Sequence, residues 1–296
     1  MAQEKSHLPN WTGLLNWSTK YHDGTSASQF GPMDPERRAW LESALNSAFD
    51  GQEDPNQVMK RAVVEIQKGR FSSGLDLLEH VSDFPDCAEN VELLGGLKEL
   101  VALVWNSDPS VVGRTLSVLN LYLPNNPKIQ LAAALKHECL RALKAAVAAN
   151  RDNAVIITLC VACIGNLVRS VTALENSFVR DGGITYLCEL AAGSSVQSAV
   201  SKVVNLIFAL RERCESSSDV DRVVVLVERI YDGVSFDRKD IQLFESTAQL
   251  VVALKLGNRV GTQLKSRMSW IESQDPAAVG DYTTETDFIR TALGIE

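Results

Sequence analysis

The feature of this chain that most constrains its fold is an internal repeat of roughly forty residues. One marker of the repeat is a leucine in similar surroundings, found at Leu100, Leu143, Leu187 and Leu226, in steps of 43, 44 and 39 residues. A second marker, in another register, is found at Asn120, Asn166, Asn205 and Gln249, in steps of 46, 39 and 44 residues. Two independent markers share one period, so the chain consists of repeated units.

Each unit has the pattern of helices that must stack on one another. Paired glycines, Gly95-Gly96 and Gly182-Gly183, precede helical patterns and suit a bend that needs positive φ or close backbone approach. The period lies in the armadillo and HEAT range, and helices of this kind bury their apolar faces only against neighbouring repeats. With 18 Gly, 9 Pro and 19 aromatic residues, the chain lacks the turns and aromatic strands of a β-sandwich. We predict an all-α, armadillo-like right-handed superhelical solenoid of about four to five repeats with an N-terminal helical extension.

The predicted domain boundaries follow from this periodicity. Armadillo-like repeats are expected over 71–262, at 71–94 (partial), 95–136, 137–181, 182–219 and 220–262, with C-terminal capping helices over 263–296. Residues 33–70 are expected to form two helices that cap the solenoid, since Asp34-Pro35 and Asp54-Pro55 each place a cap residue before an N1 proline. Residues 1–32 are expected to be flexible and to carry a short amphipathic motif of Trp11, Leu14, Leu15 and Trp17.

Negative charge is concentrated in one segment of the chain. The net charge is -8, and Phe71 to Leu94 contains six acidic residues but no lysine or arginine. The acids are Asp76, Glu79, Asp83, Asp86, Glu89 and Glu92. This segment is either a docking surface for a basic partner or a solvated acidic loop. The sequence pI of 5.2 and the absence of a basic tract argue against nucleic-acid binding.

The recurrent asparagines fall on the last helix of each predicted repeat, which lines the concave face of a solenoid. An asparagine there can hold the backbone of an extended peptide, or it can join neighbouring helices internally. Armadillo carriers of the nuclear-import type add a tryptophan near each such asparagine, but here those positions are Pro124, Ser170 and Ala209. An armadillo scaffold or basic-peptide adaptor is therefore the alternative function.

No pattern typical of an enzyme is present. The chain has no phosphate-binding glycine loop, no H-E-x-x-H pair and no G-x-S-x-G turn, and its four histidines are scattered. Cys160 and Cys163 have the C-x-x-C spacing of thiol-redox and zinc sites, but they lie in an apolar helix and are expected to be buried packing residues. We expect no catalytic residue, no metal and no cofactor.

The N-terminal sequence lacks the apolar run of a signal peptide, and no stretch approaches the length of a membrane span. We therefore expect a cytoplasmic monomer that does not bind membranes.

Several stretches together resemble the armadillo-type nucleotide exchange factors of seventy-kilodalton heat-shock chaperones, the HspBP and Fes group. The stretches are LLNWS (14–18), MDPERRAWLESAL with NQVMKRAVVEI (33–66), GLDLLEHVSDFPDCAENVELLGGL (74–97), NNPKIQ (125–130) and LVRSVTALENSFVRDGG (167–183). The resemblance spans roughly 8–215 and fades after about Cys214. It implies that the concave face clasps the chaperone's nucleotide-binding domain and promotes ADP release.

The resemblance also assigns candidate site residues. The N-terminal segment, through Trp11, Leu14, Leu15 and Trp17, would compete for the chaperone's peptide-binding site and help to release the client. The expected chaperone-binding residues are Glu79, Asp83, Asp86, Ala88, Arg114, Asn120, Asn125, Asn126, Lys128, Asn166, Arg169 and Asn205.

Overall fold

The computed structural model describes residues 34–49, 53–84, 86–194, 196–214, 216–233, 241–274 and 280–295. The chain divides into two compact units, Met1–Asp54 and Pro55–Glu296. In the first unit the described helix is α2 (Pro35–Phe49), which begins at the proline after Asp34, as the sequence predicts. The boundary between the units falls inside the segment 33–70, which the sequence analysis treats as one cap. The described residues form helices and connections, with no strand among them.

The second unit is a succession of short helical groups. Its first group consists of α3 (Pro55–Gln67) and α4 (Phe71–His80). Three groups of three follow. They are α5 (Cys87–Leu93), α6 (Gly96–Leu103) and α7 (Pro109–Tyr122); α8 (Pro127–Leu131), α9 (Cys139–Ala149) and α10 (Ala154–Val168); and α11 (Thr172–Arg180), α12 (Gly183–Gly193) and α13 (Gln197–Ala209).

The remaining helices continue the pattern. They are the 3₁₀ turn η2 (Arg211–Arg213), α14 (Ser217–Gly233), α15 (Ile241–Ala253), α16 (Gly261–Glu272), η4 (Gly280–Tyr282) and α18 (Thr283–Leu293). A π-helical turn, η1 (Ala132–Lys136), lies between α8 and α9. The repeats predicted to begin at residues 95, 137 and 182 each begin close to the second helix of a group of three, and the one predicted at 220–262 begins inside α14.

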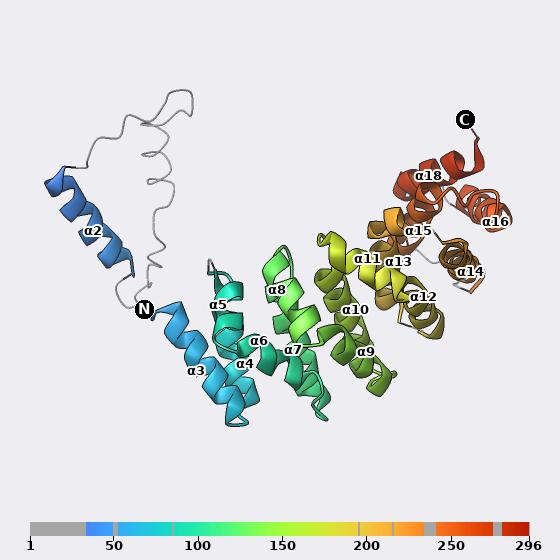
Figure 1. Cartoon of the computed structure of the whole chain (residues 1–296). Helices are drawn as coiled ribbons and strands as arrows, with labels where there is room; N and C mark the ends of the chain where they lie inside the picture. The colour runs from blue at the N-terminus through green and yellow to red at the C-terminus, as the bar shows by residue number, and fades with distance from the viewer. Residues whose placement is uncertain are drawn as a thin grey trace, which may run out of the picture. The chain divides into compact units, whose positions relative to one another are not determined.

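Helices at equivalent positions pack against one another from group to group. Contacts join α4 to α7, α7 to α10, α10 to α13, α13 to α15 and α15 to α18. Figure 1 shows the helices of this unit following one another in chain order from α3 to α18. The two sequence markers fall on matching helices: the leucines on α6, α9, α12 and α14, and the asparagines with Gln249 on α7, α10, α13 and α15. The predicted all-helical repeat fold is confirmed.

The paired glycines are required for two different reasons. Gly95 and Gly182 both have φ of +78°, the left-handed conformation that glycine adopts without strain. Gly96 and Gly183 must lack a Cβ, which would lie 2.6 Å from a Val91 methyl carbon and 2.4 Å from the Phe178 ring. In the repeat between them, Glu138 takes the left-handed position with φ of +52°. The bend is therefore retained without glycine, at a conformational cost.

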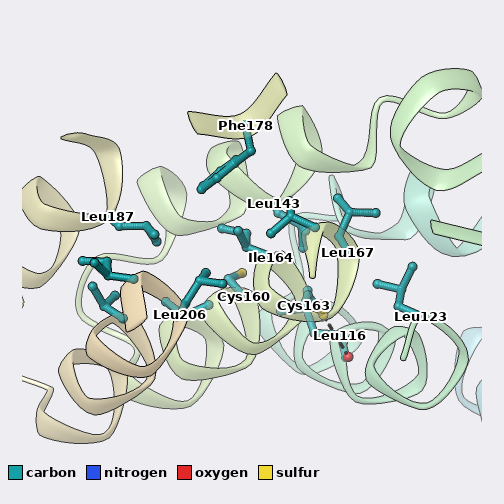
Figure 2. Close-up of a cluster of buried hydrophobic side chains, with 14 of the residues drawn as sticks. Leu116, Leu123, Leu143, Cys160, Cys163, Ile164, Leu167, Phe178, Leu187 and Leu206 are labelled. Carbon is teal, nitrogen blue, oxygen red and sulfur yellow. Dashed lines mark hydrogen bonds between the residues drawn. The ribbon is translucent and has the colours of Figure 1, made fainter. Parts of the chain in front are cut away.

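One contiguous hydrophobic core extends from Val58 to Ile289. In Figure 2, Cys160 and Cys163 lie in this core among leucine side chains, and the Cys163 thiol points toward the Leu116 carbonyl, at 3.4 Å. Burial raises the pKa of the Cys160 thiol to about 12 and also raises that of Cys163. Both thiols therefore stay protonated and act as packing residues, the alternative that the sequence analysis favours.

Candidate binding surface on the last helices of the repeats

Helices α4, α7, α10 and α13 expose polar side chains on a shared side, which we call the ladder face. We define it by Asp76, Glu79, Arg114, Ser117, Asn120, Leu121, Thr158, Ala162, Asn166, Arg169, Ser198, Lys202 and Asn205, all at least partly exposed. Direct contacts join neighbouring helices across it, such as the hydrogen bond between the hydroxyls of Thr158 and Ser198, at 2.9 Å. The sequence-predicted residues Glu79, Arg114, Asn120, Asn166, Arg169 and Asn205 all lie on the ladder face.

At the N-terminal end of the ladder face, acidic residues of one repeat pair with a base of the next. The Arg114 guanidinium hydrogen-bonds the Asp76 carboxylate and lies 3.4 Å from Glu79 Oε2. These hydrogen bonds, led by the one to Asp76, raise the pKa of Arg114. The three side chains are at least one-third exposed, so the pairing contributes about 0–1 kcal/mol to stability.

The same pairing occurs along the first helices of the repeats. Lys128 Nζ of α8 lies 2.9 Å from the Glu89 carboxylate of α5. Glu92 accepts hydrogen bonds from Lys136, at 3.1 Å, and from the ring of His137, at 2.9 Å. Although burial alone would raise the pKa of Glu92, the bonds from His137 and Lys136 hold it below its ordinary value. The acidic surplus of the segment is thus largely balanced by the next repeat.

Two of the six acids have no such partner among the described residues. Asp83 and Asp86 are exposed in the turn between α4 and α5. Asp86 begins α5 in the left-handed conformation, with φ of +61°. Ala88, one residue into that helix, is partly buried against the core. The negative charge that remains available to a partner is therefore at this turn rather than along the whole segment.

The recurrent asparagines have different environments. The Asn120 side-chain nitrogen donates to the carbonyls of Leu116, at 3.0 Å, and Leu159, at 3.3 Å. Its oxygen accepts from the Asn166 amide, at 2.8 Å, which ties α7 to α10. Asn205 is exposed and has no hydrogen-bond partner among the described residues. Internal joining, one of the two readings of the sequence, holds for Asn120 and Asn166, so these two lend little support to a peptide-carrier function.

Residues of the NNPKIQ stretch hold the end of α10 in place. Asn125 adopts φ of +57°, and the Asn126 side chain caps α8 by accepting from the backbone N–H of Ile129, at 3.2 Å. The buried Gln130 side chain donates to three carbonyls at the C-terminus of α10. These are the carbonyls of Asn166 (2.6 Å), Leu167 (3.3 Å) and Arg169 (2.8 Å). The role of Gln130 could not be predicted from the sequence, because the residues whose carbonyls it binds lie 36 to 39 positions further along the chain.

A hollow of about 250 Å³ opens on the ladder face between α10 and α13. Its polar lining consists of Asn166, Arg169, Lys202 and Asn205, and its other lining residues are Val161, Ala162, Gly165 and Leu206. Arg169 is held by its neighbours: Nη2 donates to the Asn166 side-chain oxygen at 3.2 Å and Nε to the Gly165 carbonyl at 3.3 Å. Sequence reasoning placed Asn166, Arg169 and Asn205 on the binding surface but did not include Lys202.

The predicted residues that the structure describes thus fall into four places. Asn120, Asn166, Arg169 and Asn205 come together around the α7, α10 and α13 helices, whereas Glu79 and Arg114 pair nearer the N-terminal end of the ladder face. Asn125, Asn126 and Lys128 lie at the start of α8, and Asp83, Asp86 and Ala88 at the start of α5. The client-release residues Trp11, Leu14, Leu15 and Trp17 lie outside the described residues.

Two further observations concern what the described residues do not contain. None of their helices combines the length and the apolar character needed to cross a membrane. No group of three or more potential metal ligands comes together among them.

Comparison with known proteins identifies this region. Residues 87–231, from α5 into α14, match the family model of the SIL1/FES1/HPBP1 C-terminal domain. No curated protein matches the chain. The match begins inside the stretch 74–97, which carries part of the resemblance, and extends beyond Cys214, where that resemblance fades.

Solved structures agree on the fold. One similar structure is an engineered protein, Northeast Structural Genomics Consortium Target OR329, with a TM-score of 0.59 and 12% identity, covering 79% of this chain and 97% of that one. Another is the designed armadillo repeat protein YIII(Dq)4CqI, with a TM-score of 0.57 and 12% identity, covering 80% of this chain and 98% of that one. At such low identity the likeness shows the armadillo fold alone.

Proposed function

The chain belongs, through residues 87–231, to the SIL1/FES1/HPBP1 family of Hsp70 nucleotide exchange factors, and from this premise we propose that it promotes ADP release from an Hsp70 chaperone. The observation that supports the proposal most directly is that the ladder face on α7, α10 and α13 lies inside the matched domain. In this proposal the ladder face binds the chaperone's nucleotide-binding domain.

The mechanism requires no bond chemistry in this chain. A protein that binds the open form of the nucleotide-binding domain more tightly than the closed form shifts the equilibrium toward the open form. Because linkage is reciprocal, the nucleotide then binds less tightly by the same factor. A contiguous core from Val58 to Ile289 makes the second unit a suitable rigid clasp, since a deformable one would lose part of the binding energy in its own rearrangement.

We place this activity in the cytosol. All six cysteines are free thiols, buried within single helices or at their ends. Free thiols at this number are typical of a reducing compartment, whereas proteins of oxidising compartments commonly pair theirs.

A nucleotide-release assay tests the proposal. An Hsp70 chaperone is loaded with fluorescent ADP and chased with excess ATP, with and without a stoichiometric amount of this protein. We expect the release rate to increase with the concentration of the protein until the chaperone is saturated. An unchanged rate, with purified and folded protein, would refute the function.

We also propose that the N-terminal segment with Trp11, Leu14, Leu15 and Trp17 aids client release. A chain that begins at residue 33 separates the two activities. We expect it to release ADP as the full chain does but to release a bound fluorescent client peptide more slowly. Equal client release by both chains would remove this part of the proposal.

A further inference from the structure

We infer that the hollow between α10 and α13 is a carboxylate-binding slot, in which Arg169 and Lys202 receive an acidic side chain of the chaperone's nucleotide-binding domain. This inference rests on the proposed function and adds to it the chemistry of one contact. Three observations support it: unbalanced positive charge, a glycine that keeps the hollow open, and a fixed orientation of Arg169.

The first observation is the charge of the hollow. Arg169 and Lys202 both line it, and none of its lining residues is acidic. Neither base has an ion-pair partner among the described residues. Elsewhere on the ladder face Arg114 faces two carboxylates of the preceding repeat. Two cations without a counter-charge in one hollow favour an anionic group from outside.

The neutral lining suits a carboxylate as well. Asn205 lacks a hydrogen-bond partner among the described residues, and the Asn166 amide uses one N–H on Asn120. Side-chain amides can donate N–H groups to a carboxylate oxygen. Arg169 offers the guanidinium N–H groups that are not directed at Asn166 and Gly165, in the planar geometry that matches a carboxylate.

The second observation is Gly165, in the last turn of α10. Glycine inside a helix lowers stability relative to alanine. Packing does not require it here, because an added Cβ would lie 3.7 Å from a Leu206 methyl carbon and 3.8 Å from Arg169 Nε, which are ordinary contacts. What glycine provides is space beside the Arg169 side chain, inside the hollow.

The third observation is that the Arg169 backbone and side chain are both held in place. Gln130 donates to the Arg169 carbonyl at 2.8 Å, and Asn166 and Gly165 hold the guanidinium. A base fixed in this way loses little conformational freedom when it binds an anion.

Affinity measurements with the isolated nucleotide-binding domain of an Hsp70 test the slot. Lys202→Glu should weaken binding roughly tenfold or more, because it places a carboxylate against the incoming one. Lys98→Glu is the matched control: Lys98 is exposed on α6, off the ladder face, and the charge change is the same. Binding of the wild type should also weaken more steeply with added salt than binding of Lys202→Gln.

Gly165→Ala provides a test whose expected result could not arise from misfolding of the variant. We expect this variant to unfold at a higher urea concentration than the wild type and yet to bind the chaperone domain more weakly, because the added methyl group occupies the slot. A further set of variants, single Asp→Lys and Glu→Lys changes on the chaperone domain, should contain one that restores binding to Lys202→Glu.

The results of these experiments distinguish a failure of the proposed slot from a failure of the proposed function. If the wild type accelerates ADP release while Lys202→Glu and Gly165→Ala bind as tightly as it does, the slot is refuted and the function stands. If the wild type neither binds the chaperone domain nor accelerates ADP release, both are refuted. Weaker binding by Lys202→Glu and Gly165→Ala, with Lys98→Glu unchanged, supports both.

Discussion

Gln130→Glu replaces the buried cap of α10 by a side chain of the same shape and makes stability depend on pH. The native amide donates to three carbonyls, at distances from 2.6 to 3.3 Å. A carboxylate at this place would face carbonyl oxygens and the negative end of the α10 dipole, both of which favour the protonated form. We therefore expect the pKa of the introduced carboxyl to be raised in the folded protein.

The size and sign of the effect follow from linkage. Holding the carboxyl protonated in the folded protein at pH 7, when the unfolded chain releases that proton near pH 4.3, costs roughly 3–4 kcal/mol. At pH 5 the same cost is about 1 kcal/mol. A group whose pKa is raised on folding stabilises the protein at low pH and loses that contribution as pH rises. Gln130→Glu should therefore be roughly 2–3 kcal/mol less destabilised, relative to the wild type, at pH 5 than at pH 7.

Urea unfolding at the two pH values, followed by circular dichroism, measures this difference. Gln130→Leu is the matched control: it leaves the same carbonyls without their donor, costs about 1–3 kcal/mol or somewhat more, and has nothing to titrate. The wild type corrects for the pH dependence of the other groups. If the two variants show the same change between pH 5 and pH 7, the assignment of Gln130 as the cap of α10 is wrong.

Three further predictions concern other parts of the molecule. Glu138→Gly should raise the free energy of unfolding by about 0.5–1 kcal/mol in urea titrations, because φ of +52° strains glutamate and not glycine. Arg267→Met should lower it by about 3–5 kcal/mol, because the fully buried Glu285 carboxylate loses its partner at 2.8 Å, and adding Glu285→Leu should recover part of that loss in a double-mutant cycle. Asp83→Lys with Asp86→Asn should weaken binding to the chaperone's nucleotide-binding domain in titration calorimetry, whereas an unchanged affinity would place the α4–α5 turn outside the interface.

The repeat architecture could be predicted because its causes are local and recur in the sequence. The leucine marker identifies the buried side of each second helix, as at Leu100 and Leu187, which are fully buried. The glycine pairs indicate the bends that precede α6 and α12. The bend before α9 could not be found in this way, since Glu138 gives no sign that it adopts a left-handed conformation.

The roles of individual surface residues were harder to predict because they depend on neighbours a full repeat away. The acidic run from Phe71 to Leu94 looks like one negative surface in the sequence, but Asp76 and Glu79 pair with Arg114, 38 and 35 residues later. At the C-terminal end, the buried pair of Arg267 and Glu285 gave no signal, since neither residue is part of a repeated pattern.

The repeat period itself nevertheless supplies a rule for charged residues. Side chains that touch across neighbouring repeats are separated by about one period, as in Glu89 with Lys128, 39 residues apart, and Glu175 with Arg213, 38 residues apart. A base that forms an ion pair between repeats is thus expected to find its partner about one period away.

At the α10–α13 hollow, the same spacing shows which residues lie about one period from Arg169 and Lys202. One step of about 40 residues before Lys202 lies Ala162, which lines the same hollow, and a similar step after it lies Gln242 on α15. For Arg169, a similar step backward leads to Gln130, which binds its backbone carbonyl and not its guanidinium. Neither base forms an ion pair with an acid among the described residues. Within the part of the chain that the structure describes, the charge of this hollow is therefore not used in holding repeats together, and a partner's carboxylate can bind there without first breaking an ion pair of that part.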